Sequence, residues 1–301
     1  MNLMKKPKIK KEINSMKVRI VTDSTADFSP EIKDRLTIVP LTIKFEEEEF
    51  IDGVTINKKD FYEKLKSSDL VPTTSQPTPL AFRNKYEELI EDGCEFVVLT
   101  ISSKLSGTYQ SAIIASEGLE DKVFVVDSKT ASIGEGILLE LAVNLIDEGK
   151  SAKEVAEILE KEKDNVTLVA LIDTLDYLLK GGRISKSSAM IGTLLSVKLV
   201  FTLDNGEIQV LGKARGLKNA KNLLTSQIGK AGEIDFEKPY LLGYTGLDDK
   251  NINQYIDDAK YIWEGNIERP KYTCLGSVIG THAGPGALAV AFFNKSDKKQ
   301  I

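Results

Sequence analysis

The chain has little of what metal and disulfide chemistry need. It contains one histidine, His282, and two cysteines, Cys94 and Cys274, among 301 residues. A zinc site made of histidine and cysteine needs several ligands at short spacing, but the two cysteines are far apart and neither belongs to a C-x-x-C pair. Two cysteines are also too few for a disulfide scaffold, and both adjoin apolar runs. We therefore expect no bound metal and two reduced, buried thiols.

An excess of positive charge and a long apolar run are also missing. Lys and Arg number 40 against 45 Asp and Glu, a formal net charge of −5, so we expect no nucleic-acid partner. The longest apolar run, from Ala287 to Phe293, is far shorter than the roughly 18 residues of a membrane-spanning helix, and the N-terminus lacks a secretory apolar region. These features favour a cytoplasmic protein in which any anionic ligand is held by a local site.

The sequence lacks one nucleotide-binding motif and matches a second only in part. No G-x-x-x-x-G-K-[ST] sequence occurs, so the chain has no phosphate-binding loop of the Walker type. The stretch Gly284 to Ala289 matches G-x-G-x-x-A, but a strand-like run follows it and no acidic residue stands about 20 positions later, as a dinucleotide site requires. If the protein takes part in phosphoryl transfer, another protein must supply the nucleotide.

The first half of the chain alternates strands and helices. Short apolar runs predict buried parallel strands at Val18–Thr22, Phe96–Ile101 and Val123–Val126. Ser29-Pro30-Glu31 and Thr78-Pro79 supply the N-cap hydroxyl and the proline typical of helix starts, and Gly93 ends the second helix. Strand, loop, helix and strand in this order predict βαβ units.

The second half follows a different pattern. Ser151 and Glu154 form a capping box for a helix ending near Lys163. Asn205-Gly206, between two apolar runs, predicts a β-hairpin, and so introduces antiparallel pairing. Further elements are expected at 166–172 (strand), 217–228 (helix), 240–245 (strand), 246–263 (helix), 272–279 (strand) and 287–293 (strand).

The predicted fold class is therefore α/β with two domains. Residues 16–165 form an N-terminal domain with a mainly parallel sheet flanked by helices, and residues 166–301 form a C-terminal α/β domain with antiparallel strands. Residues 1–15 are expected to be a disordered leader, and the chain is expected to cross between the domains near 40–75. The acidic run Glu46–Glu49 is interpreted as a solvated turn or strand edge.

Three loops rich in hydroxyl groups or glycine are candidates for a ligand site. Residues 72–77 and 102–108 are expected at one end of the parallel sheet, where backbone N–H groups of helix starts favour anions. Helix capping alone accounts for about half of this excess of Ser and Thr. The third loop, residues 281–286, is expected as a glycine-rich turn between two strands and holds His282.

Two arginines stand at junctions between elements. Arg183 follows the glycine pair that ends one helix and precedes another, and Arg215 follows the predicted hairpin. The sequence pattern alone does not decide the role of either arginine. A cation on the surface or at a helix cap is as good an interpretation of each arginine as a functional residue.

Five segments together resemble one family. VTDSTADFSP, PTTSQPTP, ISSKLSGTYQSA, LLKGGRIS and THAGPGALAVAF, in this order and at these intervals, are similar to the DegV family of fatty-acid-binding proteins, which includes the FakB-type binding subunit of bacterial fatty acid kinase. The resemblance covers about Met16 to Phe293.

The resemblance implies a ligand, a site and a partner. One long-chain fatty acid, such as palmitate, stearate or oleate, would lie between the two domains. Thr74 and Ser106 would bind its carboxylate, Ser75 and Gly107 would line the same loops, and His282 with Arg183 would orient the head group. Arg215 would belong to the surface that docks a separate ATP-dependent kinase subunit, which would convert the fatty acid into an acyl-phosphate. The chain itself would then be no enzyme and need no cofactor, and it would exchange lipid transiently at a membrane surface.

Two other functions remain open at the level of sequence. Ser106 as nucleophile and His282 as base would make an acyl hydrolase or acyltransferase, although no G-x-S-x-G elbow is present. A regulatory module that senses a lipid without processing it is the third hypothesis.

Overall fold

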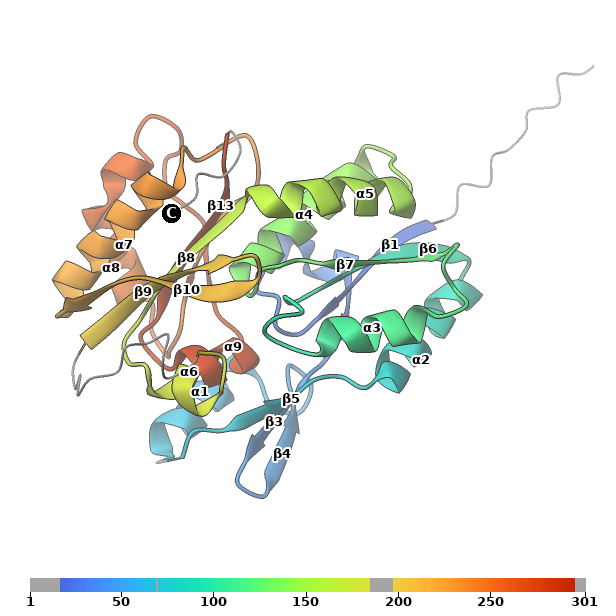
Figure 1. Ribbon diagram of the computed structural model, residues 1–301, viewed down its shortest axis with the longest axis horizontal. Coiled ribbons are helices and arrows are strands. Elements are labelled where there is room, and N and C mark those ends of the chain that lie inside the picture. Colours follow the sequence, from blue (N-terminus) through green and yellow to red (C-terminus); the bar gives the residue numbers. More distant parts are fainter. Residues whose placement is uncertain (1–16, 69, 185–196, 296–301) are drawn as a thin grey trace, which may run out of the picture.

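The computed structural model describes residues 17–68, 70–184 and 197–295, which form three sheets and the helices around them (Figure 1). The predicted leader at 1–15 lies outside these residues. None of the helices in the described ranges is long and apolar enough to cross a membrane.

The first sheet is parallel throughout, with the strand order β2-β1-β6-β7. Its strands are β1 (Lys17–Asp23), β2 (Leu36–Val39), β6 (Cys94–Thr100) and β7 (Val123–Asp127). Helices α2 (Pro79–Glu91) and α3 (Thr108–Ser116) pack on one face, and α4 (Ile133–Asp147) and α5 (Ala152–Glu162) on the other. This is the parallel α/β arrangement expected for the first half of the chain.

The second sheet has six strands in the order β10-β9-β8-β13-β11-β12, and all of its pairs are antiparallel except β11 with β12. Its strands are β8 (Val166–Ile172), β9 (Val197–Asp204), β10 (Glu207–Arg215), β11 (Tyr240–Tyr244), β12 (Tyr272–Cys274) and β13 (Leu288–Phe293). Helices α7 (Leu217–Ala231) and α8 (Lys250–Asp258) cover its outer face. The predicted hairpin at Asn205-Gly206 joins β9 to β10, and both residues have positive φ.

Helix α4 lies between the two large sheets, as Figure 1 shows. Apart from a stripe of Glu140, Asn144 and Asp147 it is mostly apolar, and its buried residues share one core cluster with Ile20 and Val97 of the first sheet and Leu168 and Ala291 of the second. A helix with so wide an apolar surface is stable only when most of that surface is enclosed. Its packing therefore fixes how the two sheets face each other.

A third, antiparallel sheet lies at the bottom of Figure 1 in the order β4-β3-β5. It consists of β3 (Thr42–Phe45), β4 (Glu48–Ile51) and β5 (Thr73–Ser75), and it packs with α1 (Lys58–Ser67) against α9 (Ser277–Ala283). The acidic run forms the exposed turn and strand start between β3 and β4, as predicted. The remaining elements are α6 (Asp176–Lys180) and the short 3-10 helices η1 (Pro30–Arg35), η2 (Lys163–Asn165) and η3 (Lys260–Ile262).

Two sequence predictions about the candidate loops are wrong. Residues 72–77 do not form a loop at the end of the parallel sheet, because Thr73–Ser75 pair with Thr42–Lys44 in the small antiparallel sheet. The segment around His282 is not a turn between strands: β12 ends at Cys274, and residues 277–283 form helix α9. Gly276 ends the extended stretch, and packing of Val278 against Ile43 and Phe61 outweighs the β-branched composition that favoured a strand.

The helix starts and the cysteines follow the predictions only in part. Thr78 and the Ser151–Glu154 box cap α2 and α5 as predicted, but the Ser29 side chain makes no capping hydrogen bond and the helix after it is a 3-10 helix. Cys94 is buried and Cys274 is only half-buried, both as free thiols. The helix expected after Arg183 lies outside the described residues.

Candidate functional site

The loop after β6 is held against the second sheet. The Ser102 backbone N–H donates to the Thr130 carbonyl at 2.8 Å, and the Ser102 hydroxyl donates to the Gly206 carbonyl at 2.8 Å. Gly206 is at the tip of the β9–β10 hairpin, so this buried bond joins the two halves of the chain. The start of this loop is therefore fixed against the hairpin of the second sheet.

Within this loop, Ser106 and Gly107 have different surroundings. Ser106 lines an apolar cavity between the two large sheets, and its Oγ lies 2.8 Å from Thr108 Oγ1. Gly107 does not line the cavity and precedes α3. A Cβ at Gly107 would overlap with Gln76 Oε1, so the glycine gives space to Gln76, which donates to Ser111 at 3.0 Å.

Thr74 and Ser75 are neighbours on β5 but face different ways, because side chains alternate along a strand. Thr74 is half-buried and lines the cavity, and its Oγ1 lies 2.9 Å from His282 Nε2. Ser75 is exposed and does not line the cavity. The structure thus brings Thr74, but not Ser75, to His282.

His282 is a neutral imidazole in an enclosed position. Burial lowers its pKa to about 4, and the nearby Arg183 cation contributes to this lowering. Its Nδ1 is buried with no hydrogen-bond partner among the described residues. A Cβ at Gly181 would overlap with this nitrogen, so the glycine allows α6 and α9 to approach closely.

Arg183 completes the group. Its Nε donates to the Leu105 carbonyl at 3.1 Å, and its Nη1 donates to the Gly181 carbonyl at 2.6 Å. These bonds use two of the five N–H donors of a guanidinium and orient the rest. Because Gly181 touches His282 and Leu105 precedes Ser106, the four predicted residues Thr74, Ser106, Arg183 and His282 form one cluster.

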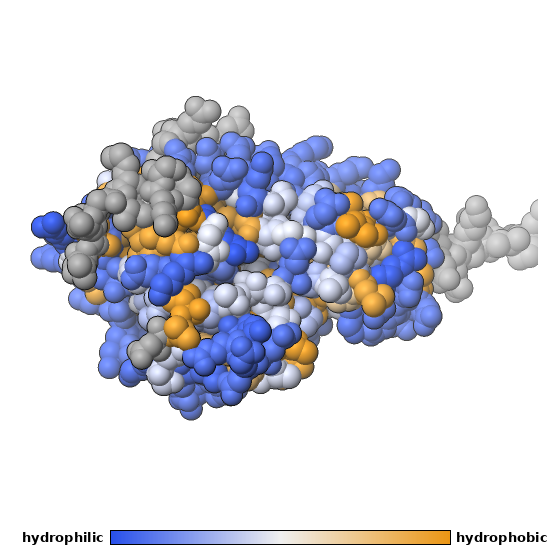
Figure 2. Space-filling model, turned by 60° about the horizontal axis from the view of Figure 1, so that its bottom comes forward, coloured by the Kyte–Doolittle hydropathy of each residue, from blue (hydrophilic) through white to orange (hydrophobic). Residues whose placement is uncertain are grey.

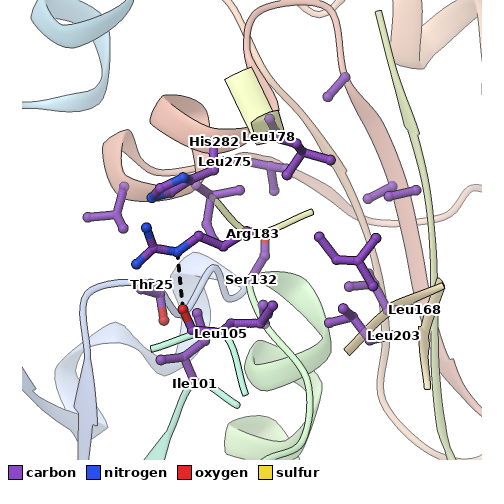
Figure 3. A pocket seen from close by; sticks show the side chains of 18 of the residues that line it. Thr25, Ile101, Leu105, Ser132, Leu168, Leu178, Arg183, Leu203, Leu275 and His282 are labelled. Carbon is purple, nitrogen blue, oxygen red and sulfur yellow. Dashed lines mark hydrogen bonds between the residues drawn. The ribbon is translucent and has the colours of Figure 1, made fainter. Parts of the chain in front are cut away.

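The cluster lies at the wall of an apolar cavity between the sheets. In Figure 3, His282, Arg183 and Thr25 lie on one side, and Leu168 and Leu203 lie on the opposite side. The space between the lining atoms comes to about 830 Å³, part of it open to solvent. The apolar lining on the second sheet consists of Leu168, Ala170 and Ile172 of β8, Phe201 and Leu203 of β9, Ile208 of β10, and Leu288 and Ala289 of β13.

Figure 2 shows, on the face that it presents, several separate apolar patches with polar residues between them. On this face an extended apolar ligand would meet interrupted apolar surface, whereas the cavity lining is largely apolar.

Sequence reasoning missed a buried acidic network behind the cavity. Thr25, which lines the cavity, has its Oγ1 2.5 Å from Asp23 Oδ1 and 3.0 Å from Glu135 Oε2. One hydroxyl hydrogen cannot serve both carboxylates, so one of the two carboxyl groups carries a proton. Accordingly, burial and the Asp23 charge raise the pKa of Glu135 well above its usual value. The available signal was the acidic residue Glu135 in the first, otherwise apolar, turn of α4.

Arg215 is separate from this cluster. It is the exposed last residue of β10, does not line the cavity, and precedes Gly216 with a φ of 78° at the start of α7. Its carbonyl accepts a hydrogen bond from Asn219 at 3.0 Å.

The geometry does not suit a Ser-His-acid hydrolase. Ser106 Oγ contacts Thr108, whereas His282 contacts Thr74 and no described carboxylate orients its Nδ1. A histidine with a pKa of about 4 is also a weak base at neutral pH. Among the described residues, no group of three or more His, Cys, Asp or Glu side chains is arranged to hold a metal ion.

Known proteins resemble this chain over almost its whole length. The family description "Uncharacterised protein, DegV family" matches residues 17–295. A DegV domain-containing protein of Clostridium perfringens is 33% identical over 279 residues, which cover 92% of this chain and 98% of that protein.

Two solved structures extend the comparison. A DegV family protein of Thermus thermophilus, described as fatty acid binding, shares 31% identity and superimposes with a TM-score of 0.81 over 92% of this chain and 100% of its own. The fatty acid kinase B3 protein of Streptococcus pneumoniae, loaded with linoleic acid, has the same fold at 23% identity, with a TM-score of 0.79 over 92% and 99% of the two chains. Because the family model matches residues 17–295 and the Clostridium relative is 33% identical over 92% of this chain, this chain belongs to the DegV family.

Proposed function

We propose that the protein binds one long-chain fatty acid, with the carboxylate beside Thr74, Ser106, Arg183 and His282 and the hydrocarbon chain in the cavity between the sheets. The observation that carries this proposal is the combination of a largely apolar cavity with one cluster of anion-binding groups at its wall. The Thermus relative, which is described as fatty acid binding, supports it.

Most of the affinity comes from the hydrocarbon chain. Burial of about 14 methylenes at about 0.8 kcal/mol each contributes roughly 11 kcal/mol before ordering costs. A hydrogen bond to a charged head group contributes about 1.5 to 3 kcal/mol. The cluster at the wall therefore serves mainly to fix the register and orientation of the carboxylate.

Hydrogen bonding explains how a neutral histidine serves an anion. When the His282 proton is on Nε2, this N–H donates to Thr74 Oγ1, and the Thr74 hydroxyl hydrogen is then available to the carboxylate. Arg183 supplies the compensating positive charge and is held by two carbonyls. Ser106 adds a second hydroxyl on the same wall.

We further propose that the bound carboxylate is presented to a separate ATP-dependent kinase for acyl-phosphate formation. The absence of a Walker-type motif in the chain and the fold shared with a fatty acid kinase B protein support this role. In this proposal the exposed Arg215 lies on the docking surface rather than in the lipid site.

Native mass spectrometry tests the binding proposal. The purified protein is expected to carry one additional mass of a fatty acid per chain, which denaturing extraction then identifies. Ala170→Phe, which fills the cavity from β8, is expected to remove this mass while the protein stays folded, because the added ring enters existing space. A purified protein with no extractable lipid and no uptake of added oleate would contradict the proposal.

A further inference from the structure

Asp27, which plays no part in the cluster described above, joins three separate segments. Its carboxylate accepts hydrogen bonds from the Gly276 backbone N–H at 2.7 Å, from the Ser132 hydroxyl at 2.8 Å and from Lys58 Nζ at 3.1 Å. The Asp27 side chain is only 1% exposed. Charge-assisted bonds to a buried carboxylate are among the stronger polar interactions in proteins.

The three donors lie on the segments that surround the lipid site. Gly276 precedes α9, which carries His282; Ser132 precedes α4 and itself lines the cavity. Lys58 begins α1, which packs on the small sheet that carries Thr74. Asp27 therefore contacts both parts of the molecule that contribute to the Thr74–His282 pair.

Helix α1 is also held to α9 and to the segment just before it at several further points. Lys58 Nζ also donates to the Cys274 carbonyl at 2.6 Å, and the Tyr62 hydroxyl donates to the Leu275 carbonyl at 3.0 Å. A Cβ at Gly280 would lie 2.7 Å from the Phe61 ring, so the two helices are in close contact. A change at the Asp27–Lys58 pair is thus transmitted to α9 and to the small sheet together.

We propose that Asp27 and Lys58 are positioning residues for the head group: they set the separation of Thr74 and His282, and through it the preference for a carboxylate over an uncharged head. This inference rests on the proposed fatty-acid function. It adds two residues, neither of which lines the cavity, to the machinery that recognises the carboxylate.

The test compares two ligands with the same chain, oleate and oleyl alcohol, by calorimetric titration of delipidated protein. Asp27→Asn is expected to weaken oleate binding about tenfold, a loss of the size that one charge-assisted hydrogen bond contributes. The same variant is expected to weaken the binding of oleyl alcohol less than twofold. Lys58→Met keeps the Gly276 and Ser132 bonds to Asp27, and is expected to weaken oleate binding severalfold with the same selectivity. This second variant keeps the test valid if Asp27→Asn does not fold.

Lys271→Met is the matched control. Lys271 pairs with Glu31 at 2.7 Å and so also links the two halves of the chain, but at an exposed position outside the cavity lining. It is expected to leave both affinities unchanged. Equal losses for oleate and oleyl alcohol in the Lys58 variant, or no loss for either, would overturn the positioning role. Failure of the unsubstituted protein to bind oleate would instead overturn the proposed function.

Discussion

Thr74 and Ser75 are adjacent residues with the same chemistry, yet we expect only Thr74 to serve the ligand. Thr74→Ala combined with Ser106→Ala removes two hydrogen bonds to the carboxylate, which should cost about 3 to 6 kcal/mol of binding free energy. The rise in melting temperature on adding oleate should shrink accordingly.

Ser75→Ala is the control, because Ser75 is exposed and points away from the cavity. It should leave the oleate-induced shift unchanged. A full shift in the Thr74/Ser106 double variant would show that these hydroxyls do not bind the head group.

The buried carboxyl group of Asp52 makes the stability of the protein depend on pH, and the direction of this dependence follows from its raised pKa. It is 7% exposed, and burial, together with the Asp27 charge, raises its pKa from 3.8 to about 6 against the opposing effects of Ser24, Ser277 and Lys58. A carboxyl whose pKa is raised in the folded state favours folding when protonated, so stability falls as the pH rises from about 4 to about 6 and stays lower above pH 6. Asp52→Asn should raise the free energy of unfolding at pH 8 by up to about 3 kcal/mol and change it little at pH 4.

Chemical denaturation at the two pH values measures this difference. Asp147→Asn is the contrasting variant, since a hydrogen bond from Arg35 lowers the pKa of Asp147 and its removal should not stabilise the protein at pH 8. An equal effect of Asp52→Asn at both pH values would contradict the assigned ionisation.

At the scale of elements, the start of α4 depends on a glycine. A Cβ at Gly136 would overlap with the Asp27 carbonyl oxygen, which is backbone and has no rotamer to change. Gly136→Ala should therefore destabilise the protein by about 1 to 3 kcal/mol and disturb the Asp27 loop. Thermal unfolding measures the loss.

Gly229, in α7, is the matched helical glycine, because a Cβ there meets nothing within 4 Å. Gly229→Ala should stabilise the protein by about 0.5 to 1 kcal/mol through helix propensity. Equal and small effects at both glycines would show that α4 is less tightly packed against the loop than the structure indicates.

The same elements show what the sequence was able to predict. Capping residues and apolar runs act locally, so α2, α5, β6, β8 and the Asn205-Gly206 hairpin were predicted close to their observed ends. Helix α9 and strand β5 depend on partners distant in the chain: Val278 packs on Ile43, and Thr74 pairs with Ile43. Local pattern alone does not contain these contacts, and it also missed α1 and α4.

The candidate site divides in the same way. Motif resemblance identified Thr74, Ser106, Arg183 and His282, which the structure brings together. The resemblance did not distinguish Thr74 from Ser75, because the direction in which each side chain points depends on how the strand pairs in the sheet. The Thr25–Asp23–Glu135 network was also missed, since its hydrogen bond from Thr25 to Glu135 joins positions 110 residues apart.

At the scale of the whole molecule, lipid binding and partner docking should be separable. Arg215→Ala is expected to leave oleate occupancy intact but to lower acyl-phosphate formation with a kinase partner by about tenfold, with a reduced dependence on salt, because it removes an exposed cation. Occupancy and kinase-dependent ATP consumption are measured on the same samples. Loss of lipid from this variant would place Arg215 in the lipid site, and unchanged turnover would exclude it from docking.

A crystal structure with a stearate brominated at its last carbon shows how the proposed fatty acid is oriented between the two large sheets. We expect the carboxylate within about 3 Å of Thr74 Oγ1 and beside Arg183. We expect the anomalous signal of bromine near Leu168 and Leu203, on the opposite side of the cavity. A bromine beside His282, or a ligand bound outside the cavity, would contradict the proposed orientation.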